Sequence, residues 1–201
     1  MVMVTKIEAR ALTRERLLDA ANELFYGEGV QTVGIDRVIE HAGVAKASLY
    51  KAFGNKEGLV CAYLERRFER RKEQIARTLT RFRTPREQLL GVFDALGEVF
   101  TDPQFNGCAF ARASAEANQD SAIRKVADDY RAWLRDLLTE LAAASGYTDP
   151  ETLGRQLLQL YDGAEQSARL DRDPSAATTA RAAATALLNA APLVAAAPTG
   201  Q

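Results

Sequence analysis

The sequence has little of what redox, metal and hydrolytic centres need. Its 201 residues include one histidine, His41, and two cysteines, Cys61 and Cys108. Without a cluster of cysteines and histidines, neither a zinc site nor a histidine-dependent catalytic triad can be assembled. We therefore predict no catalytic residue, no metal ion and no other cofactor, and the chain is not expected to be an enzyme. Two cysteines are also too few for a disulfide framework, so both are expected to be reduced and buried.

Long apolar runs are missing as well. No stretch approaches the roughly 18 consecutive apolar residues of a membrane-spanning helix, and the opening segment MVMVTKIEARALTRER has no apolar signal core. We therefore expect a cytoplasmic protein that does not contact a membrane. The strict alternation of β-branched residues that is typical of strands is absent too, whereas alanine, leucine, glutamate and arginine recur at helical spacing. The sequence therefore predicts an all-α fold of about nine helices.

The charge is distributed unevenly along the chain. The net charge is −1, but residues 1–80 carry +3 and residues 81–201 carry −4. A locally basic front end on an acidic protein indicates contact with a polyanion through a small patch and not through the whole surface.

The first three predicted helices are short and closely spaced. Thr13 is a candidate cap for a helix with an apolar face at Leu17, Ala21, Leu24 and Phe25. A second helix is expected over residues 35–42, with Thr32 or Gly34 as its cap and Gly43 as its end. A third short helix is expected to follow the Val44–Ala45 corner, to open at Lys46 and to end at Gly54. Two short helices joined by a turn of about three residues form the layout of a helix-turn-helix.

The segment GVAKASLYKAFGNKEGLV carries three lysines and no acid before Glu57. Lys46, Ala47 and Ser48 are small or polar residues at the start of the third helix, where they can enter a DNA major groove and contact base edges. Tyr50 and Lys51 are expected to contact phosphates. Lys56 follows the candidate cap Asn55 at the start of a fourth helix, where its charge adds to that of the helix dipole.

Residues 13–64 resemble the N-terminal domain of the TetR family of transcriptional repressors. The resemblance is carried by Leu24, Phe25, Gly29, Ile35, Val38, Ala42, Gly43, Val44, Leu49, Tyr50, Phe53, Lys56, Glu57 and Leu59. By this resemblance Lys46, Ala47 and Ser48 correspond to positions near the bases, and Tyr50, Lys51 and Lys56 to phosphate contacts. Gly34 departs from the family, which often has Thr or Ser there, and Thr32 is the candidate for the lost hydroxyl contact to phosphate.

The resemblance also implies an organisation for the whole chain. A flexible N-terminal arm (1–12) is expected to precede the three-helix DNA-binding domain (13–57), which is followed by a larger helical bundle for ligand binding and dimerisation (58–191) and a disordered tail (192–201). Proteins of this kind are homodimers that pair through their last two long helices, here expected over residues 151–171 and 174–191. They bind double-stranded, palindromic DNA operators and respond to a small-molecule effector.

The effector pocket is predicted less sharply than the DNA-binding residues. Aromatic and polar residues that could line a largely apolar cavity are Phe68, Phe93, Phe100, Phe105, Cys108, Phe110, Arg112, Trp133, Tyr161, Asp162 and Gln166. Their character favours an apolar or aromatic effector that releases a repressor from DNA. An alternative keeps DNA binding but replaces the ligand by an oxidant sensed through Cys61 and Cys108, and an architectural DNA-binding protein without sequence preference is a further possibility.

A cluster of arginines on the fourth helix is expected to be solvated. Arg66, Arg67, Arg70 and Arg71 alternate with Glu65, Glu69 and Glu73, which is typical of an exposed helical face with ion pairs between neighbouring turns.

Overall fold

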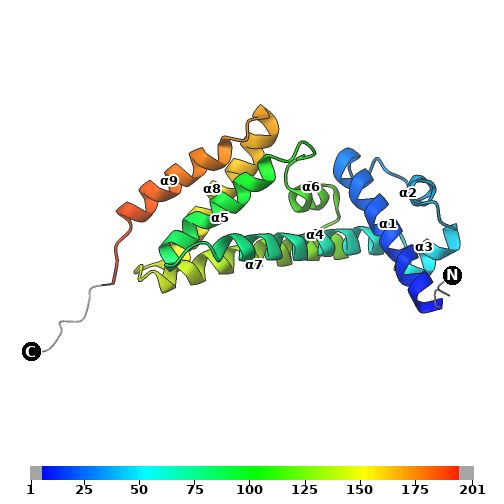
Figure 1. Ribbon diagram of the computed structural model, residues 1–201, viewed down its shortest axis with the longest axis horizontal. Helices are drawn as coiled ribbons and strands as arrows, with labels where there is room; N and C mark the ends of the chain where they lie inside the picture. The colour runs from blue at the N-terminus through cyan, green and yellow to red at the C-terminus, as the bar shows by residue number, and fades with distance from the viewer. Residues whose placement is uncertain (1–5, 195–201) are drawn as a thin grey trace, which may run out of the picture. The chain divides into compact units, whose positions relative to one another are not determined.

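The computed structural model describes residues 6–194, and within this range the chain forms nine α-helices and no strand (Figure 1). The predicted all-α fold is therefore confirmed. The helices fall into two compact units. Unit 1 comprises the residues up to Arg70 together with Cys108–Tyr130, and unit 2 comprises Arg71–Gly107 together with the residues from Arg131 onwards.

Unit 1 is built around the first three helices. It contains α1 (Lys6–Glu28), α2 (Ile35–Ala42), α3 (Lys46–Phe53), α6 (Ala109–Glu116) and the first parts of α4 (Lys56–Leu79) and α7 (Ala122–Ala144). The apolar face of α1 packs against α2 and α3, and Leu17, Val38 and Leu49 are completely buried. The rings of Phe25 and Tyr63 meet edge to face, with 5.8 Å between their centroids, and join α1 to α4.

The first helix begins earlier than the sequence predicted. α1 starts at Lys6, and Thr13 lies inside the helix, where its hydroxyl donates to the carbonyl oxygen of Ala9 at 2.8 Å. Residues 6–12 of the predicted N-terminal arm are therefore helical, while residues 1–5 lie outside the described range. Residues 7–12 are all exposed, Ile7 and Leu12 among them, so the buried apolar face of α1 does not extend to this part of the helix.

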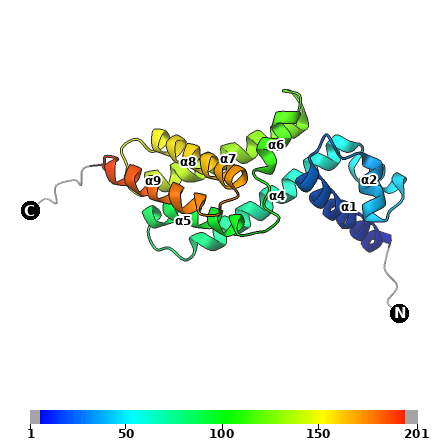
Figure 2. The ribbon, with the colours of Figure 1, turned by 90° about the horizontal axis from the view of Figure 1, so that it is seen from above.

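Unit 2 is a bundle of longer helices. It contains α5 (Pro85–Phe100), α8 (Pro150–Asp171), α9 (Ala176–Ala190) and the later parts of α4 and α7. α9 lies along both α5 and α8 (Figures 1 and 2) and buries Ala177, Ala180, Ala184 and Leu188 against them. The predicted start of α5 is confirmed, because Thr84 and Glu87 form a reciprocal capping box with Pro85 in the first turn.

An ion pair is buried inside unit 2. Arg71 of α4 and Glu165 of α8 lie with 3.5 Å between their charged atoms, and their side chains are only 14% and 6% exposed. Arg71 also donates to Oε1 of Gln74 at 3.3 Å. Because buried charges are stable only when they are paired, these helices are held in register by charge as well as by apolar packing.

The residues that follow α9 form backbone hydrogen bonds with the loop that precedes α8. The amide of Thr148 donates to the carbonyl of Pro192 at 3.0 Å, and the amide of Val194 donates to that of Gly146 at 2.8 Å. Tyr147 forms an isolated antiparallel bridge with Leu193. Residues 192–194 of the predicted tail (192–201) thus make backbone contacts with residues 146–148, and its remainder lies outside the described residues.

Candidate functional site

The turn between α2 and α3 has a defined backbone geometry. Gly43 adopts the left-handed conformation, with φ 61°, and ends α2. Its amide donates to Glu40 O and the amide of Val44 donates to Ile39 O, which is the paired hydrogen-bond pattern of a Schellman motif. Val44 and Ala45 then lead directly into α3. The predicted helix-turn-helix is present, and its turn fixes the direction in which α3 leaves α2.

α3 presents one polar face to solvent. Lys46, Ala47, Tyr50 and Lys51 are all exposed, and Leu49 is buried against the core of unit 1. Because an α-helix turns by about 100° per residue, the four exposed residues share one side of the helix. Ser48 is half-buried and falls outside this face. The structure thus brings together, on one side of α3, four of the seven residues predicted to contact DNA.

Lys46 already has a partner. Its ammonium donates to the carboxylate of Asp36 on α2 at 2.7 Å, and both side chains are more than half exposed. The hydrogen bond and the charge of Asp36 raise the pKa of the Lys46 ammonium above its usual value. This acid was not anticipated, because Asp36 lies outside the acid-free segment, ten residues before Lys46. The Asp36 carboxylate therefore competes with DNA for the Lys46 ammonium.

The remaining predicted DNA-contacting residues, Lys56 and Thr32, lie outside α3. Lys56 lies half-buried at the first position of α4, next to Asn55, whose side-chain oxygen accepts a hydrogen bond from the amide of Gly58 at 2.8 Å. Asn55 therefore caps α4 as predicted. Thr32 is exposed in the loop before α2, and Gly34 caps that helix without a side-chain hydrogen bond.

Two arginines near the middle of α4, Arg66 and Arg67, bind the first helix. Arg66 pairs with Asp19 at 2.9 Å, and Arg67 donates to Asn22 at 2.8 Å while its guanidinium lies 3.7 Å from the ring centre of Tyr26. The prediction of a solvated face with pairs inside α4 is wrong for these residues. Their partners lie about 45 positions earlier in the chain, a separation that local charge periodicity does not reveal.

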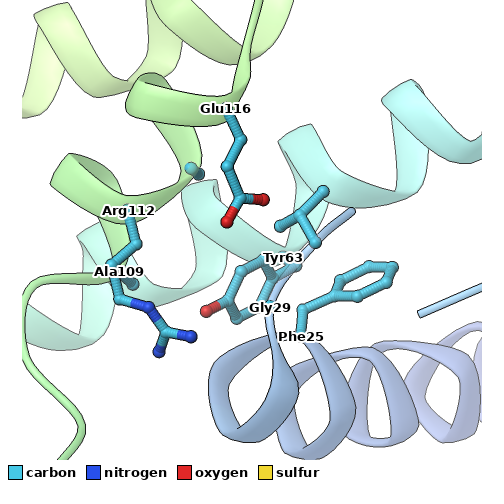
Figure 3. Close-up of a pocket in the computed structure, with 8 residues that line it drawn as sticks. Phe25, Gly29, Tyr63, Ala109, Arg112 and Glu116 are labelled. Atoms are coloured by element: carbon cyan, nitrogen blue, oxygen red, sulfur yellow. The ribbon is translucent and has the colours of Figure 1, made fainter. Parts of the chain in front are cut away.

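Two hydrogen bonds join α6 to the end of α1 and to the loop that follows it. The amide of Gln31 donates to the carboxylate of Glu116 at 3.1 Å, and Arg112 donates to the carbonyl of Tyr26 at 2.7 Å. Figure 3 shows Arg112 and Glu116 reaching from α6 toward Tyr63 of α4 and the end of α1. The hollow between them is about 10 Å³, which is the space of a single water molecule.

Burial changes the acidity of Tyr63 beside this hollow. Removal of its hydroxyl from water raises the pKa of Tyr63 to about 12, against an ordinary value of 10.0. The side chain is only 2% exposed. It is therefore neutral at any physiological pH and acts here as an apolar ring with a polar tip.

The predicted effector residues are distributed over both units. Unit 1 holds Phe68, Cys108, Phe110 and Arg112, and unit 2 holds Phe93, Phe100, Phe105, Trp133, Tyr161, Asp162 and Gln166.

Aromatic side chains of this set form local groups within each unit. In unit 1, Phe68 and Phe110 both contact Tyr130, whose ring stacks on that of Phe110 at 3.9 Å. In unit 2, Phe93 lies 6.4 Å from Tyr161 and both are almost completely buried.

The other predicted ligand residues are placed differently. Phe100 and Phe105 pack against each other at 4.7 Å. Asp162 is paired with Arg131 at 2.7 Å, and Gln166 is exposed. Asp162 is thus held by a charge on α7 and must break that pair to bind a polar group of a ligand.

A larger groove lies at the ends of α8 and α9. It has a free volume of about 300 Å³ and is lined by Tyr147, Asp149, Thr152, Leu153, Gln156, Leu187, Ala190, Ala191 and Pro192. None of these residues was predicted to bind a ligand, and of the predicted set only Arg112 lines the smaller hollow in unit 1. No sequence signal marks this groove, because its lining is a mixture of small, apolar and polar side chains from two helix ends.

Both cysteines are half-buried, and neither Cys61 nor Cys108 forms a disulfide. Burial raises the pKa of the Cys61 thiol, and the nearby carboxylates of Glu57 and Glu65 raise it further. Since the thiolate is the form that reacts with oxidants, this environment disfavours the redox alternative for Cys61.

Metal-binding and membrane-spanning features are absent from residues 6–194. This range holds no group of three His, Cys, Asp or Glu side chains arranged for a metal ion. Among the helices of this same range, none is long and apolar enough to cross a membrane.

Proteins similar to this chain are transcriptional regulators. Residues 17–63 match the sequence model of a family described as bacterial regulatory proteins, tetR family. The crystal structure of SCO4454, a TetR-family transcriptional regulator from Streptomyces coelicolor, is 32% identical with a TM-score of 0.84, over 89% of this chain and 95% of that one. A putative TetR-type regulator from Streptomyces avermitilis is 33% identical with a TM-score of 0.72, over 86% and 98% of the two chains.

A curated relative matches over a shorter range. The uncharacterised HTH-type transcriptional regulator Rv1255c of Mycobacterium tuberculosis is 33% identical over 79 residues, which is 39% of each chain. The aligned part therefore spans about two fifths of that relative's length.

Proposed function

This chain belongs to the TetR family of bacterial regulatory proteins, and on that premise we propose that it is a homodimeric repressor released from its operator by a small, largely apolar or aromatic molecule. Its family makes it a DNA-binding transcriptional regulator, in agreement with the prediction that it is not an enzyme. Family membership does not itself assign particular residues or ligands. We therefore propose, in addition, the DNA-contacting residues, the roles of the domains, the dimer and the class of effector.

The observation that carries the proposal is the exposed face of α3. Four side chains that can donate to phosphates or touch bases, those of Lys46, Ala47, Tyr50 and Lys51, share this face, and Leu49 anchors the helix from behind. Lys56 and Thr32 extend the same proposed surface at its edges. We assign phosphate contacts to Tyr50, Lys51, Lys56 and Thr32.

Base contacts are assigned to the start of α3. Lys46 and Ala47 are exposed there, and Ser48 is included on the family resemblance although it is half-buried. The Asp36 carboxylate is expected to weaken the Lys46 contact, because it competes with a base for the same ammonium.

A dimer through α8 and α9 is supported by the outer side of α9. Thr178, Thr179, Ala182, Ala183 and Ala186 are exposed there, away from the alanines that pack on α5 and α8. Small side chains let a second helix approach closely. Two copies would place two α3 helices for half-sites about 34–36 Å apart, which requires a palindromic operator.

An apolar or aromatic effector is supported by the aromatic groups in the proposed regulatory region. Phe93 and Tyr161 in unit 2, and Phe68 with Phe110 and Tyr130 in unit 1, provide apolar ring surfaces. Rings of this kind stack on flat apolar molecules and have few groups for a sugar or a nucleotide.

The DNA part of the proposal is tested by selecting operator sequences from randomised duplexes with the purified protein. Lys56→Ala is expected to weaken binding equally on all sequences and to lower the slope of log K against log salt by about 1, because one phosphate contact is lost. Lys46→Ala or Ser48→Ala should change the selected bases at particular half-site positions. Arg77→Ala, an exposed arginine in the last turn of α4, is the matched control and should leave slope and selected sequence unchanged.

Two outcomes would contradict these assignments. If Lys56→Ala keeps the wild-type salt slope, Lys56 does not contact phosphate. If selection returns no preferred sequence, the protein is an architectural DNA-binding protein and not an operator-specific repressor.

Tryptophan fluorescence provides a screen for the effector. Trp133 is its single tryptophan and belongs to the proposed ligand set, so compounds that bind there are expected to change its emission and to release operator DNA. Trp133→Phe should remove the optical signal from the same compounds without abolishing release. A compound that releases DNA and leaves Trp133 emission unaltered would place the effector elsewhere.

A further inference from the structure

The ion pair between α2 and α3 lies on the surface that we assign to DNA. Lys46 is the first residue of α3, and its ammonium donates at 2.7 Å to the carboxylate of Asp36, the second residue of α2. The two side chains are 57% and 82% exposed, so the pairing buries neither of them. A hydrogen-bond donor and an acceptor are thus held side by side in solvent at the start of α3.

The stability of the fold does not account for Asp36. Ion pairs between exposed side chains contribute little to stability, because water screens the charges and the ordering of two flexible side chains costs entropy. The direction of α3 is already set by Gly43 in its left-handed conformation and by Leu49, which is completely buried. A carboxylate on this surface also repels the phosphates of DNA. Asp36 therefore carries a cost in DNA binding that its part in the fold does not explain.

The pairing does not use up the hydrogen-bonding capacity of either group. An ammonium has three N–H donors, and Lys46 gives one of them to Asp36. An ionised carboxylate has about four acceptor positions, so Asp36 can accept further hydrogen bonds beside the ammonium. The two side chains can therefore bind a neighbouring acceptor and donor of DNA at the same time without separating from each other.

One base pair presents the complementary pattern in the major groove. Guanine offers the acceptors N7 and O6, and cytosine offers its N4 amino donor next to that O6. Because O6 and N4 are hydrogen-bonded to each other, they lie about 2.9 Å apart, close to the 2.7 Å between Lys46 Nζ and the Asp36 oxygen. In an A·T pair the adenine amino group lies between two acceptors, adenine N7 and thymine O4. These acceptors repel a carboxylate, so the arrangement favours G·C.

We propose that Asp36 and Lys46 together recognise one G·C base pair in each half-site, with the Lys46 ammonium on guanine O6 and N7 and the Asp36 carboxylate on the N4 amino group of cytosine. Asp36 is then a specificity-determining residue. Its charge weakens binding to other base pairs, and cytosine N4 offsets that cost. Competition for the Lys46 ammonium is thus least where the same base pair also binds the carboxylate. This inference rests on the proposed function, in which Lys46 contacts a base.

The test selects binding sequences from randomised duplexes with the full-length wild type and with Asp36→Ala, and then measures affinity for duplexes that differ at one position. The wild type should select G·C at one position of each half-site. Asp36→Ala and Lys46→Ala should both weaken the selection at that same position and leave the other positions as they are. Asp36→Ala should lower the preference for G·C over A·T there by at least about fivefold, the lower end for a lost base contact.

Glu40→Ala is the matched control, because it removes the same charge from an exposed position one turn further along α2 and should leave the selected sequence unchanged. If Asp36→Ala raises the affinity for all duplexes by one factor, Asp36 only competes for the Lys46 ammonium and the inference is overturned. A uniform loss of affinity, with the G·C preference kept, would show that Asp36 only supports the fold and would overturn it as well.

These outcomes also separate the inference from the proposed function. Either uniform change leaves a regulator that selects an operator, so the proposed function stands while the role of Asp36 fails. A wild type that selects no sequence refutes the operator-specific repressor, and the recognition of G·C fails with it. Thermal unfolding should give the same melting temperature for Asp36→Ala, Glu40→Ala and the wild type, because these side chains are exposed.

Discussion

The buried pair of Arg71 and Glu165 can be tested by removing one charge at a time. Glu165→Leu keeps an apolar side chain of similar reach in the bundle but leaves the Arg71 guanidinium without the Glu165 carboxylate. Breaking a buried ion pair on one side typically costs about 3–5 kcal/mol. The 3.5 Å separation and the hydrogen bond that Arg71 keeps with Gln74 place the expected cost at the lower end, about 3 kcal/mol.

The double variant Arg71→Met with Glu165→Leu supplies the decisive comparison. Replacing both charges by apolar side chains removes the desolvation cost of each, so its stability should lie close to that of the wild type or above it. The interaction between the two sites is then the difference between the double variant and the sum of the single ones.

The assay is equilibrium unfolding in guanidinium chloride, with all variants at one protein concentration because a dimer's stability depends on it. For a chain of this length, a loss of about 3 kcal/mol corresponds to a fall in melting temperature of roughly 6–12 °C. Lys125→Met, which removes an exposed pair with Asp129, is the matched surface control and should change nothing measurable. A cost below about 1 kcal/mol for Glu165→Leu, or a double variant as unstable as the single one, would refute the reasoning.

The other predictions concern two titratable groups. Because the pKa of Tyr63 is raised to about 12 from 10.0, its contribution to stability is complete below pH 10 and is lost as the pH rises through 12. The free energy of unfolding of the wild type relative to Tyr63→Phe should fall over that range by up to about 3 kcal/mol, and a flat difference would show that Tyr63 titrates normally. Since burial raises the pKa of the Cys61 thiol, Cys61 should react with iodoacetamide at neutral pH more slowly than a free cysteine, and peroxide should leave DNA binding unaltered. Loss of binding that Cys61→Ser prevents would restore the redox alternative.

Local chemistry explains why much of the fold could be predicted from sequence. Gly43, Asn55 and the Thr84–Pro85 pair mark helix ends through backbone geometry and short-range hydrogen bonds, and these signals are contained in a few neighbouring residues. α8 was expected over residues 151–171 and runs over Pro150–Asp171 for the same reason.

Features that depend on distant partners could not be predicted in this way. Residues 7–12 at the start of α1 are all exposed, so the buried apolar face from which this helix was predicted does not reach them. Asp36 holds Lys46, and Asp19 holds Arg66, from other helices. Charge spacing along one helix suggested pairs inside that helix, because sequence reports neighbours in the chain and not neighbours in space.

Residues 108–130 belong to unit 1 although they are separate in sequence from its first 70 residues, and this limits which fragments of the chain can fold on their own. The carboxylate of Glu116 accepts a hydrogen bond from the amide of Gln31, and the carboxylate of Glu57 accepts one from the amide of Ala122. The ring of Tyr130 contacts that of Phe68. A gene fragment that stops after residue 70 would remove all three partners at once and uncover rings that are now packed. The first 70 residues are therefore not expected to be transferable as an independent DNA-binding domain. A chimera with another regulator must include residues 108–130 along with the first four helices.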